Sequence, residues 1–273
     1  MRICLCSANY VADASGYRVQ PFDWGRCEQT TLEAFSGGAW EGHFRALLQR
    51  VRALGYTAIE VWQAHLRAAT ATERQLVTAR RLLDEVGLRC ASYTSFFSDP
   101  QTPRTDVAAA FRVAAALGAG VIAGGMHRAM AETVDALARE TGVRMAIENH
   151  GETPAAVAEL LGDLPASYAA TIGATVDTGI YAGQGVDPVD ACQLLAGRIF
   201  HVHLKDVAAV GGHACCAAGR GVARLRAVTA ELRRQGYGGY LSIECETLDH
   251  DSDPEAAESL RTVQGWLVEA PMP

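Results

Sequence analysis

The sequence lacks the features that mark several large classes of protein. No apolar stretch reaches the roughly 18 residues that a membrane-spanning helix needs. The formal net charge is −7, whereas a nucleic-acid-binding protein normally has a basic surface. No G-x-G-x-x-G turn follows the first predicted strand. These absences argue against a membrane protein, a nucleic-acid-binding protein and a dinucleotide-binding sheet.

Disulfides are also not expected, although the chain has eight cysteines. None of them forms a C-x-x-C pair, and the adjacent Cys215 and Cys216, in a Gly/Ala-rich loop, cannot easily bridge each other. Four others lie in apolar, strand-like runs, where a thiol is usually a small core residue: Cys4, Cys6, Cys90 and Cys245. No secretory signal peptide is apparent at the start of the chain. We therefore predict reduced thiols and a cytoplasmic location.

Strand-like and helix-like segments alternate from one end of the chain to the other. Strands are predicted near residues 2–7, 58–62, 89–93, 120–124, 144–149, 173–177, 199–204 and 240–245. Helices are predicted near 41–54, 72–86, 105–117, 130–141, 154–161, 187–196, 221–235 and 254–268. Eight such units predict that residues 1–273 form a single-domain (β/α)8 TIM barrel. An open doubly wound sheet is the alternative, but it rarely has eight even units.

The last strands favour the closed barrel. In 240–246, apolar and polar residues alternate, with Leu241 and Ile243 on one face and Ser242, Glu244 and Glu246 on the other. An open sheet covered on both faces would need both sets to be apolar. The polar set, which in 199–205 comprises His201, His203 and Lys205, is therefore predicted to face the barrel axis.

Two connections are longer than a barrel needs. Residues 8–39 join the first strand to the first helix and contain several glycines and aromatic residues. Such a long connection is usually functional or disordered, and its aromatic residues favour a lid or a subunit contact, in a homodimer or homotetramer. Residues 206–220 are the second candidate for a loop that covers the mouth.

Four apolar runs in the second half of the chain end in residues that can bind a metal or move a proton. These runs are IENH at 147–150, VDTG at 176–179, HVHLKD at 201–206 and SIECE at 242–246. Their reactive members are Glu148, Asp177, His203 and Glu244. The carboxyl ends of barrel strands meet at one rim. We therefore predict one divalent cation there, with Mn²⁺, Mg²⁺ or Co²⁺ favoured over zinc by the oxygen-rich ligands. The alternative is that these polar residues only satisfy one another.

The chain resembles the xylose isomerase-like TIM-barrel superfamily, in its branch of sugar phosphate isomerases and epimerases. The resemblance rests on the four motifs, on the G-x-G of Gly219 and Gly221, and on RRQGYGGYLSIECE at 233–246. It implies one divalent metal, commonly Mn²⁺, held by the four residues named above, with the two glutamates also handling protons. Ile180 stands where many relatives have histidine. This departure argues against a substrate contact common in ketose 3-epimerases and against the trinuclear zinc site of endonuclease IV.

These residue types predict a reaction. Removing a proton beside a carbonyl makes an enediolate, whose negative oxygens need a nearby cation. Two carboxylates can take the proton from one face and return it on the other. We predict that Glu148 and Glu244 are this catalytic pair; the alternative is that both are only ligands. The predicted enzyme is a metal-dependent isomerase or epimerase of a sugar or keto-sugar.

Three other functions are weighed against this prediction. A metal-dependent dehydratase or lyase on a keto-cyclitol or keto-glycoside would begin with the same proton abstraction. A phosphodiesterase would need further His or Asp ligands and a basic groove, and a silent sugar-binding barrel would not need a complete metal site. The predicted partner is a small carbohydrate, without phosphate, because no Gly-rich phosphate loop is evident after the last two strands.

Other polar and aromatic residues share the inward face or lie in strand-end loops. Substrate binding is predicted for His150, Lys205, Glu246, Arg220, Trp62 and His127. Three alternatives remain open: Lys205 pairs with Asp206, Glu246 pairs with Arg220, and His127 is an ordinary exposed histidine. His65 is also expected to be exposed. Glu60 is expected to be a buried, paired carboxylate and His201 a packed, hydrogen-bonded histidine.

Overall fold

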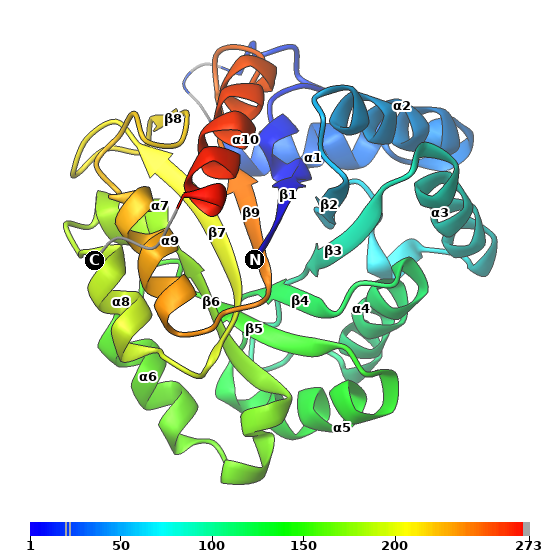
Figure 1. The fold of residues 1–273 in the computed structure, drawn as a ribbon. Coiled ribbons are helices and arrows are strands. Elements are labelled where there is room, and N and C mark those ends of the chain that lie inside the picture. Colours follow the sequence, from blue (N-terminus) through cyan, green and yellow to red (C-terminus); the bar gives the residue numbers. More distant parts are fainter. Residues whose placement is uncertain (20, 22, 270–273) are drawn as a thin grey trace.

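Parallel pairing joins eight strands into a closed ring (Figure 1). In chain order these strands are β1 (Arg2–Cys6), β2 (Ala58–Val61), β3 (Arg89–Thr94), β4 (Val121–Gly124), β5 (Arg144–Glu148), β6 (Ile172–Asp177), β7 (Ile199–Val207) and β9 (Tyr240–Glu244). Strand β9 lies between β7 and β1, and β6 pairs with β7, which closes the barrel. The computed structural model describes residues 1–19, 21 and 23–269. The predicted TIM barrel is confirmed.

A ring of helices surrounds the strands (Figure 1). The predicted helices correspond to α2 (Trp40–Ala53), α3 (Glu73–Val86), α4 (Arg104–Leu117), α5 (Ala131–Thr141), α6 (Pro154–Asp163), α8 (Pro188–Leu194), α9 (Leu225–Arg234) and α10 (Asp253–Val268). The glycines expected to end helices have φ between 73° and 97°, a left-handed conformation that glycine adopts without steric cost: Gly55, Gly87, Gly118, Gly142 and Gly236.

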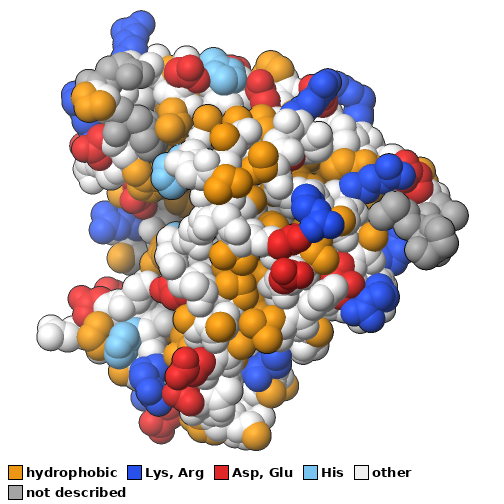
Figure 2. Space-filling view, turned by 90° about the vertical axis from the view of Figure 1, so that its left-hand side faces the viewer, with side chains coloured by type: hydrophobic (Ala, Val, Ile, Leu, Met, Phe, Trp, Pro, Cys, Tyr) orange, Lys and Arg blue, Asp and Glu red, His pale blue; other side chains and the backbone are white. Residues whose placement is uncertain are grey.

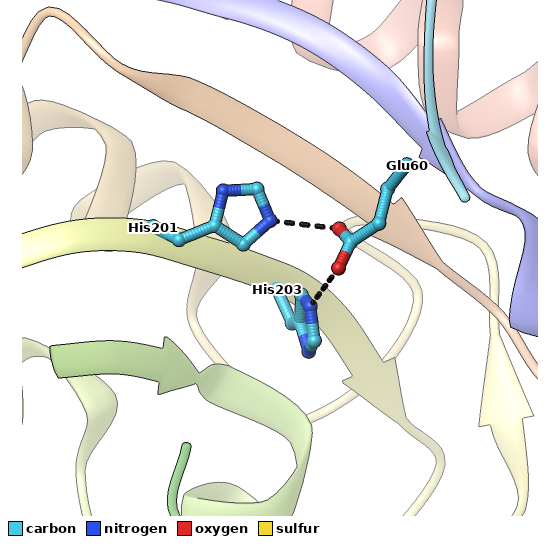
Figure 3. A group of neighbouring side chains, drawn as sticks. All are labelled: Glu60, His201 and His203. Atoms are coloured by element: carbon cyan, nitrogen blue, oxygen red, sulfur yellow. Dashed lines mark hydrogen bonds and ion pairs between the residues drawn. The ribbon is translucent and has the colours of Figure 1, made fainter. Parts of the chain in front are cut away.

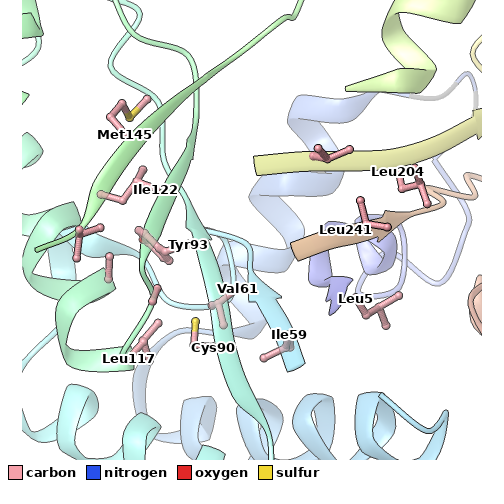
Figure 4. Packing of buried hydrophobic residues seen from close by; sticks show 14 of the residues in the cluster. Leu5, Ile59, Val61, Cys90, Tyr93, Leu117, Ile122, Met145, Leu204 and Leu241 are labelled. Carbon is pink, nitrogen blue, oxygen red and sulfur yellow. The ribbon is translucent and has the colours of Figure 1, made fainter. Parts of the chain in front are cut away.

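The hydrophobic core lies between the strands and these helices. Apolar side chains of the strands pack there, among them Leu5, Ile59, Tyr93, Ile122 and Leu241 (Figure 4). All five are fully buried. The alternate positions of the strands hold the polar side chains, so the predicted apolar and polar faces are correct. The cysteines predicted as core residues are also buried: Cys4, Cys6, Cys90 and Cys245.

The connection at 8–39 is more regular than the sequence indicated. It contains η1 (Ser7–Tyr10), α1 (Trp24–Ala34) and η2 (Gly37–Ala39). Asp23 caps α1 by accepting a hydrogen bond from the Arg26 backbone N–H at 3.0 Å, an N-cap that was not recognised in the sequence. Positions 20 and 22 lie outside the described residues. Most of this connection is therefore built of short helices.

The segment after β7 also differs from the prediction. Cys215 and Cys216 form a short strand, β8 (Cys215–Cys216), antiparallel to the end of β7, instead of lying in an irregular loop. The predicted helix at 221–235 begins only at Leu225, after Arg224 with a φ of 52°. Asp206 accepts hydrogen bonds from the backbone N–H groups of Gly219 and Gly221, which holds this segment in a loop.

The flank formed by α6 and α8 is partly apolar at its surface. Figure 2 shows hydrophobic side chains running down the middle of this face, with charged side chains on both sides of them. Leu194, the last residue of α8, is 54% exposed. Among the described residues, no helix combines the length and the apolar character needed to cross a bilayer.

Candidate metal centre

The carboxyl ends of β5, β6, β7 and β9 bring the four predicted ligands together. Each of Glu148, Asp177, His203 and Glu244 offers one ligand atom, and these atoms all lie within 4.8 Å of one another. The four side chains are buried, with at most 6% of their surface exposed. Three acids and one imidazole that are far apart in the sequence therefore form one cluster.

Local hydrogen bonds position Asp177. Its Oδ1 accepts the Ile180 backbone N–H at 2.8 Å, which caps α7 (Thr178–Gly183), a short helix that was not predicted. Its own backbone N–H donates to Asn149 Oδ1 at 2.8 Å, and Asn149 Nδ2 donates to its carbonyl at 3.2 Å. Oδ2 has no hydrogen-bond partner among the described residues. One oxygen is thus fixed by the fold and the other is left for a ligand.

The cluster has the properties that a cation would require. Among the described residues, the buried Oδ2 of Asp177 has no hydrogen-bond partner, and Oε2 of Glu244 has only the longer ion-pair contacts to His203 and Lys205. Buried polar atoms are nearly always paired, and buried carboxylates are paired or coordinate metals. Hard carboxylate oxygens with one imidazole suit Mn²⁺, Mg²⁺ or Co²⁺. The residues present therefore fit a divalent ion.

Glu60 connects this cluster to a deeper histidine. His201 Nε2 donates to Glu60 Oε2 at 2.7 Å and His203 Nε2 donates to Glu60 Oε1 at 3.1 Å (Figure 3). Burial opposes the charge on Glu60, but the two imidazoles hold its pKa well below its usual range. An ionised carboxylate only accepts hydrogen bonds, so Nε2 of His203 is the donor to Glu60. The other ring nitrogen of His203, Nδ1, then faces the cluster. The predictions that Glu60 is buried and paired and that His201 is packed and hydrogen-bonded are confirmed.

His203 Nδ1 faces the carboxylates of the cluster. It lies 2.7 Å from Glu148 Oε1 and 3.4 Å from Glu244 Oε2. Burial lowers the pKa of His203, but the negative charges of Glu148, Glu60 and Glu244 outweigh it and raise this pKa well above its usual value. The proton on Nδ1 therefore lies between the imidazole and the carboxylates of the cluster. A bound cation would replace this proton and interact with the same carboxylates.

Burial and mutual repulsion perturb the other acids. Burial raises the pKa of Asp177 to about 7, although Lys205 opposes the change. Burial would also raise the pKa of Glu244, but Lys205 and His203 outweigh it, and this pKa is lowered. Strongly perturbed carboxyl groups in a buried cluster are typical of functional sites.

Lys205 joins the cluster instead of pairing with its sequence neighbour. Its Nζ lies 2.5 Å from Glu246 Oε2 and 3.6 Å from Glu244 Oε2. The predicted alternative pairing with Asp206 is wrong, because Asp206 accepts backbone N–H groups. The pairing of Glu246 with Arg220 is also wrong: Arg220 binds Glu258 of α10 at 2.6 Å and is 70% exposed. Burial raises the pKa of Glu246 to about 8, against the effect of Lys205.

The remaining candidate substrate residues lie at different depths. His150 is 47% exposed, with Nε2 3.5 Å from Glu148 Oε2, and its ring contacts Phe96 edge to face. Trp62 is buried and packs edge to face against Trp24 of α1. His127 is half-buried, and its Nδ1 accepts the Ala129 backbone N–H at 3.2 Å, capping the turn η4 (Arg128–Met130). Helix α1 thus contacts the mouth of the barrel through Trp24.

His65 is buried, and the expectation that it is exposed is wrong. Only 1% of its surface is accessible. Its Nδ1 lies 3.0 Å from Ser7 Oγ, and its ring packs 4.5 Å from that of Phe35. The connection between α1 and α2 covers it, which no local pattern around residue 65 indicates. Burial lowers the pKa of His65 to about 3.

Two supporting residues were missed in the sequence. Asn149 lies between the candidates Glu148 and His150, and Thr178 follows Asp177. The Thr178 hydroxyl lies 2.9 Å from the Lys205 backbone N–H and 3.1 Å from the His203 carbonyl. Both tie neighbouring strand ends together, and the only sequence feature that marks them is adjacency to a candidate ligand.

The closed parallel barrel and the acid-rich cluster at its rim define a β/α barrel with a candidate divalent-metal site. The chain belongs to the family described as xylose isomerase-like TIM barrel, whose model matches residues 48–269. This family membership confirms the resemblance inferred from the motifs. No match was found among curated proteins.

Solved structures have the same fold at low sequence identity. A xylose isomerase-like TIM barrel protein from Mycobacterium smegmatis in complex with magnesium is 18% identical, with a TM-score of 0.69 over 83% of this chain and 89% of that one. D-allulose 3-epimerase from Methylomonas sp. is 19% identical, with a TM-score of 0.65 over 86% and 94%. The probable 3-DHS dehydratase from Bacillus anthracis is 14% identical, with a TM-score of 0.67 over 97% and 99%. At these identities the similarity is one of fold.

Proposed function

We propose that this protein is a divalent-metal-dependent isomerase or epimerase of a sugar or keto-sugar. The observation that supports this proposal most strongly is the buried cluster of Glu148, Asp177, His203 and Glu244. Its ligand atoms lie within 4.8 Å of one another, and among the described residues Oδ2 of Asp177 has no hydrogen-bond partner. Membership of the xylose isomerase-like family and the similarity to D-allulose 3-epimerase favour carbohydrate chemistry.

The four residues of the cluster would hold one ion, with Mn²⁺ as our first choice and Mg²⁺, Co²⁺ or Zn²⁺ as alternatives. A bound divalent cation supplies positive charge beside the oxygens of an enediolate. The neighbour in complex with magnesium supports a site of this type in the family. The protein's own contribution is to hold His203 through Glu60 and Asp177 through Ile180 and Asn149.

In our proposal Glu148 and Glu244 move the proton. They project from β5 and β9, two strands that are not neighbours in the barrel, so they approach the centre of the mouth from different sides. One carboxylate takes the proton beside the substrate carbonyl, and the other returns a proton to the opposite face. Lys205, 3.6 Å from Glu244, would donate to a substrate oxygen, and His150 and Trp62 would bind the rest of an unphosphorylated sugar.

The experiment is metal analysis of the purified protein, followed by a panel of 2-keto and 3-keto sugars in D₂O monitored by NMR. We expect inversion or carbonyl migration together with uptake of solvent deuterium, dependent on the added metal. Glu148→Gln and Glu244→Gln should each slow deuterium uptake by at least about 100-fold, because a general acid or base is lost. The control is Glu73→Gln on α3, whose exposed side chain pairs with Arg112 of α4 away from the cluster, and it should leave the rate unchanged.

Deuterium uptake at the normal rate in both variants would contradict the proton-transfer role and leave the glutamates as ligands only. A dehydratase or lyase is the second candidate, favoured by the similarity to the probable 3-DHS dehydratase over 97% of this chain. The same spectra distinguish it, because loss of a hydroxyl or an aglycone would replace inversion or carbonyl migration.

A further inference from the structure

A cavity lies at the end of the barrel opposite the metal cluster. It has a volume of about 500 Å³ and is lined by residues at the start of β1, β3, β4, β5, β7 and β9 together with parts of α3 and α4. The metal cluster is at the carboxyl ends of the parallel strands, so the two sites are separated along the strand direction. A volume of this size is within the range of pockets for small organic ligands.

Arginines dominate the charged residues of this cavity. Its lining contains Arg2, Arg80, Arg89 and Arg144 but only one acid, Asp84. Asp84 Oδ2 accepts a hydrogen bond from Arg80 at 3.2 Å, so this pair is neutral. Among the described residues, the other three guanidinium groups have no acidic partner. A local excess of three positive charges is unusual in a chain of net charge −7.

Aromatic rings hold two of the unpaired arginines. The guanidinium of Arg2 lies 4.1 Å from the centre of the Tyr240 ring, and that of Arg144 lies 4.3 Å from the centre of the Phe200 ring. Stacking on a ring fixes a guanidinium without consuming its hydrogen-bond donors. Both groups are therefore positioned while their N–H groups remain available to another partner.

We propose that this cavity binds the phosphate group of a small organic molecule. Arginine recognises phosphate through paired, charge-assisted hydrogen bonds, and Arg2, Arg89 and Arg144 supply such donors around one cavity. The volume exceeds that required by a single phosphate ion, which favours a phosphorylated organic molecule over free phosphate. This site is distinct from the metal cluster and does not depend on the reaction proposed there.

The test is calorimetric titration of the metal-loaded protein with three probes: inorganic phosphate, pyrophosphate and glycerol 3-phosphate. We expect saturable binding of one equivalent, tighter for glycerol 3-phosphate than for inorganic phosphate. Arg89→Gln and Arg144→Gln should each weaken binding by about ten-fold, because each removes one charged donor. The matched control is Arg261→Gln on α10, which removes an arginine as exposed as Arg89 from outside the cavity and should bind like the wild type.

Three results would overturn the proposal. These are no saturable binding of any probe, equal binding by the Arg89, Arg144 and Arg261 variants, or binding that is lost when Asp177 of the metal cluster is replaced. Tighter binding of inorganic phosphate than of glycerol 3-phosphate would overturn the assignment to an organic ligand.

Discussion

At the scale of single residues, the site depends on carboxylates whose two oxygens have different tasks. Glu60 accepts from His201 with one oxygen and from His203 with the other. Asp177 caps α7 with Oδ1 and keeps Oδ2 for the cluster. In each of these acids the two oxygens face different partners. An amide has only one oxygen, so Gln at position 60 or Asn at position 177 would lose one of the two acceptors.

We predict that Glu60→Gln will weaken metal binding by about 10- to 100-fold, the usual effect of removing a group that orients a metal-binding histidine. In glutamine an NH₂ donor replaces one of the two carboxylate oxygens, so one imidazole loses its acceptor and His203 is held less firmly with Nδ1 toward the cluster. The measurement is calorimetric titration with Mn²⁺, with the exposed Glu73→Gln on α3 as the control. A purely structural role for Glu60 would reduce the free energy of unfolding and leave the Mn²⁺ affinity unchanged.

At the scale of elements, short polar bridges fix the segments that follow the strands. Asp206, at the end of β7, accepts four backbone N–H groups, two on each oxygen: those of Val207, Gly219, Gly221 and Ala223. An added Cβ at Gly221 would lie 2.2 Å from the Val207 carbonyl oxygen, so only glycine fits there. This network explains why α9 begins later than the sequence pattern indicated.

We predict that Asp206→Asn will destabilise the protein by about 3 kcal/mol, because one side-chain oxygen becomes a donor and two buried N–H groups lose their acceptor. Urea unfolding of the metal-loaded protein would measure this change, again beside Glu73→Gln. A loss below about 0.5 kcal/mol, the usual range for surface substitutions, would show that the network does not stabilise the fold.

At the scale of the whole molecule, the segments at 7–10 and 24–40 cover the part of the barrel mouth that lies beyond β1 and β2. His65 is buried beneath them, with Ser7 and Phe35 as contacts. Burial lowers its pKa from 6.5 to about 3. Between these values the unfolded chain binds a proton at this position and the folded chain does not, so stability falls as the pH decreases from about 6.5 toward 3.

We predict that this histidine contributes up to about 1.4 kcal/mol per pH unit to the decline in unfolding free energy below pH 6. In His65→Gln the decline should be shallower by this amount, so the stability difference between wild type and variant shrinks as the pH falls. Urea unfolding at pH 7, 6 and 5 would measure it, with the exposed His213→Gln as the control. Parallel pH profiles for wild type and His65→Gln would contradict the prediction.

The periodic patterns and the four motifs were sufficient to predict the barrel, the eight helices that follow its strands and the residues that meet at its rim, but not α1 or α7. This was possible because the alternation of side chains along a strand is a local property of the sequence. In a parallel barrel, moreover, the carboxyl ends of all strands lie at the same rim. The partners of Lys205, Glu246, Arg220 and His65 could not be predicted in this way. Each partner lies on a different element, and the choice between a neighbour in sequence and one across the barrel depends on distances that only packing sets.

The sequence alone therefore determined the architecture and the chemical character of the cluster, because both follow from the order and spacing of residue types along the chain. Only the tertiary structure decided that Glu60 links two histidines, that Lys205 faces Glu244 and Glu246, and that arginines from separate strands surround one cavity. These relations join residues between about 40 and 140 positions apart, and closing the barrel brings them together in space.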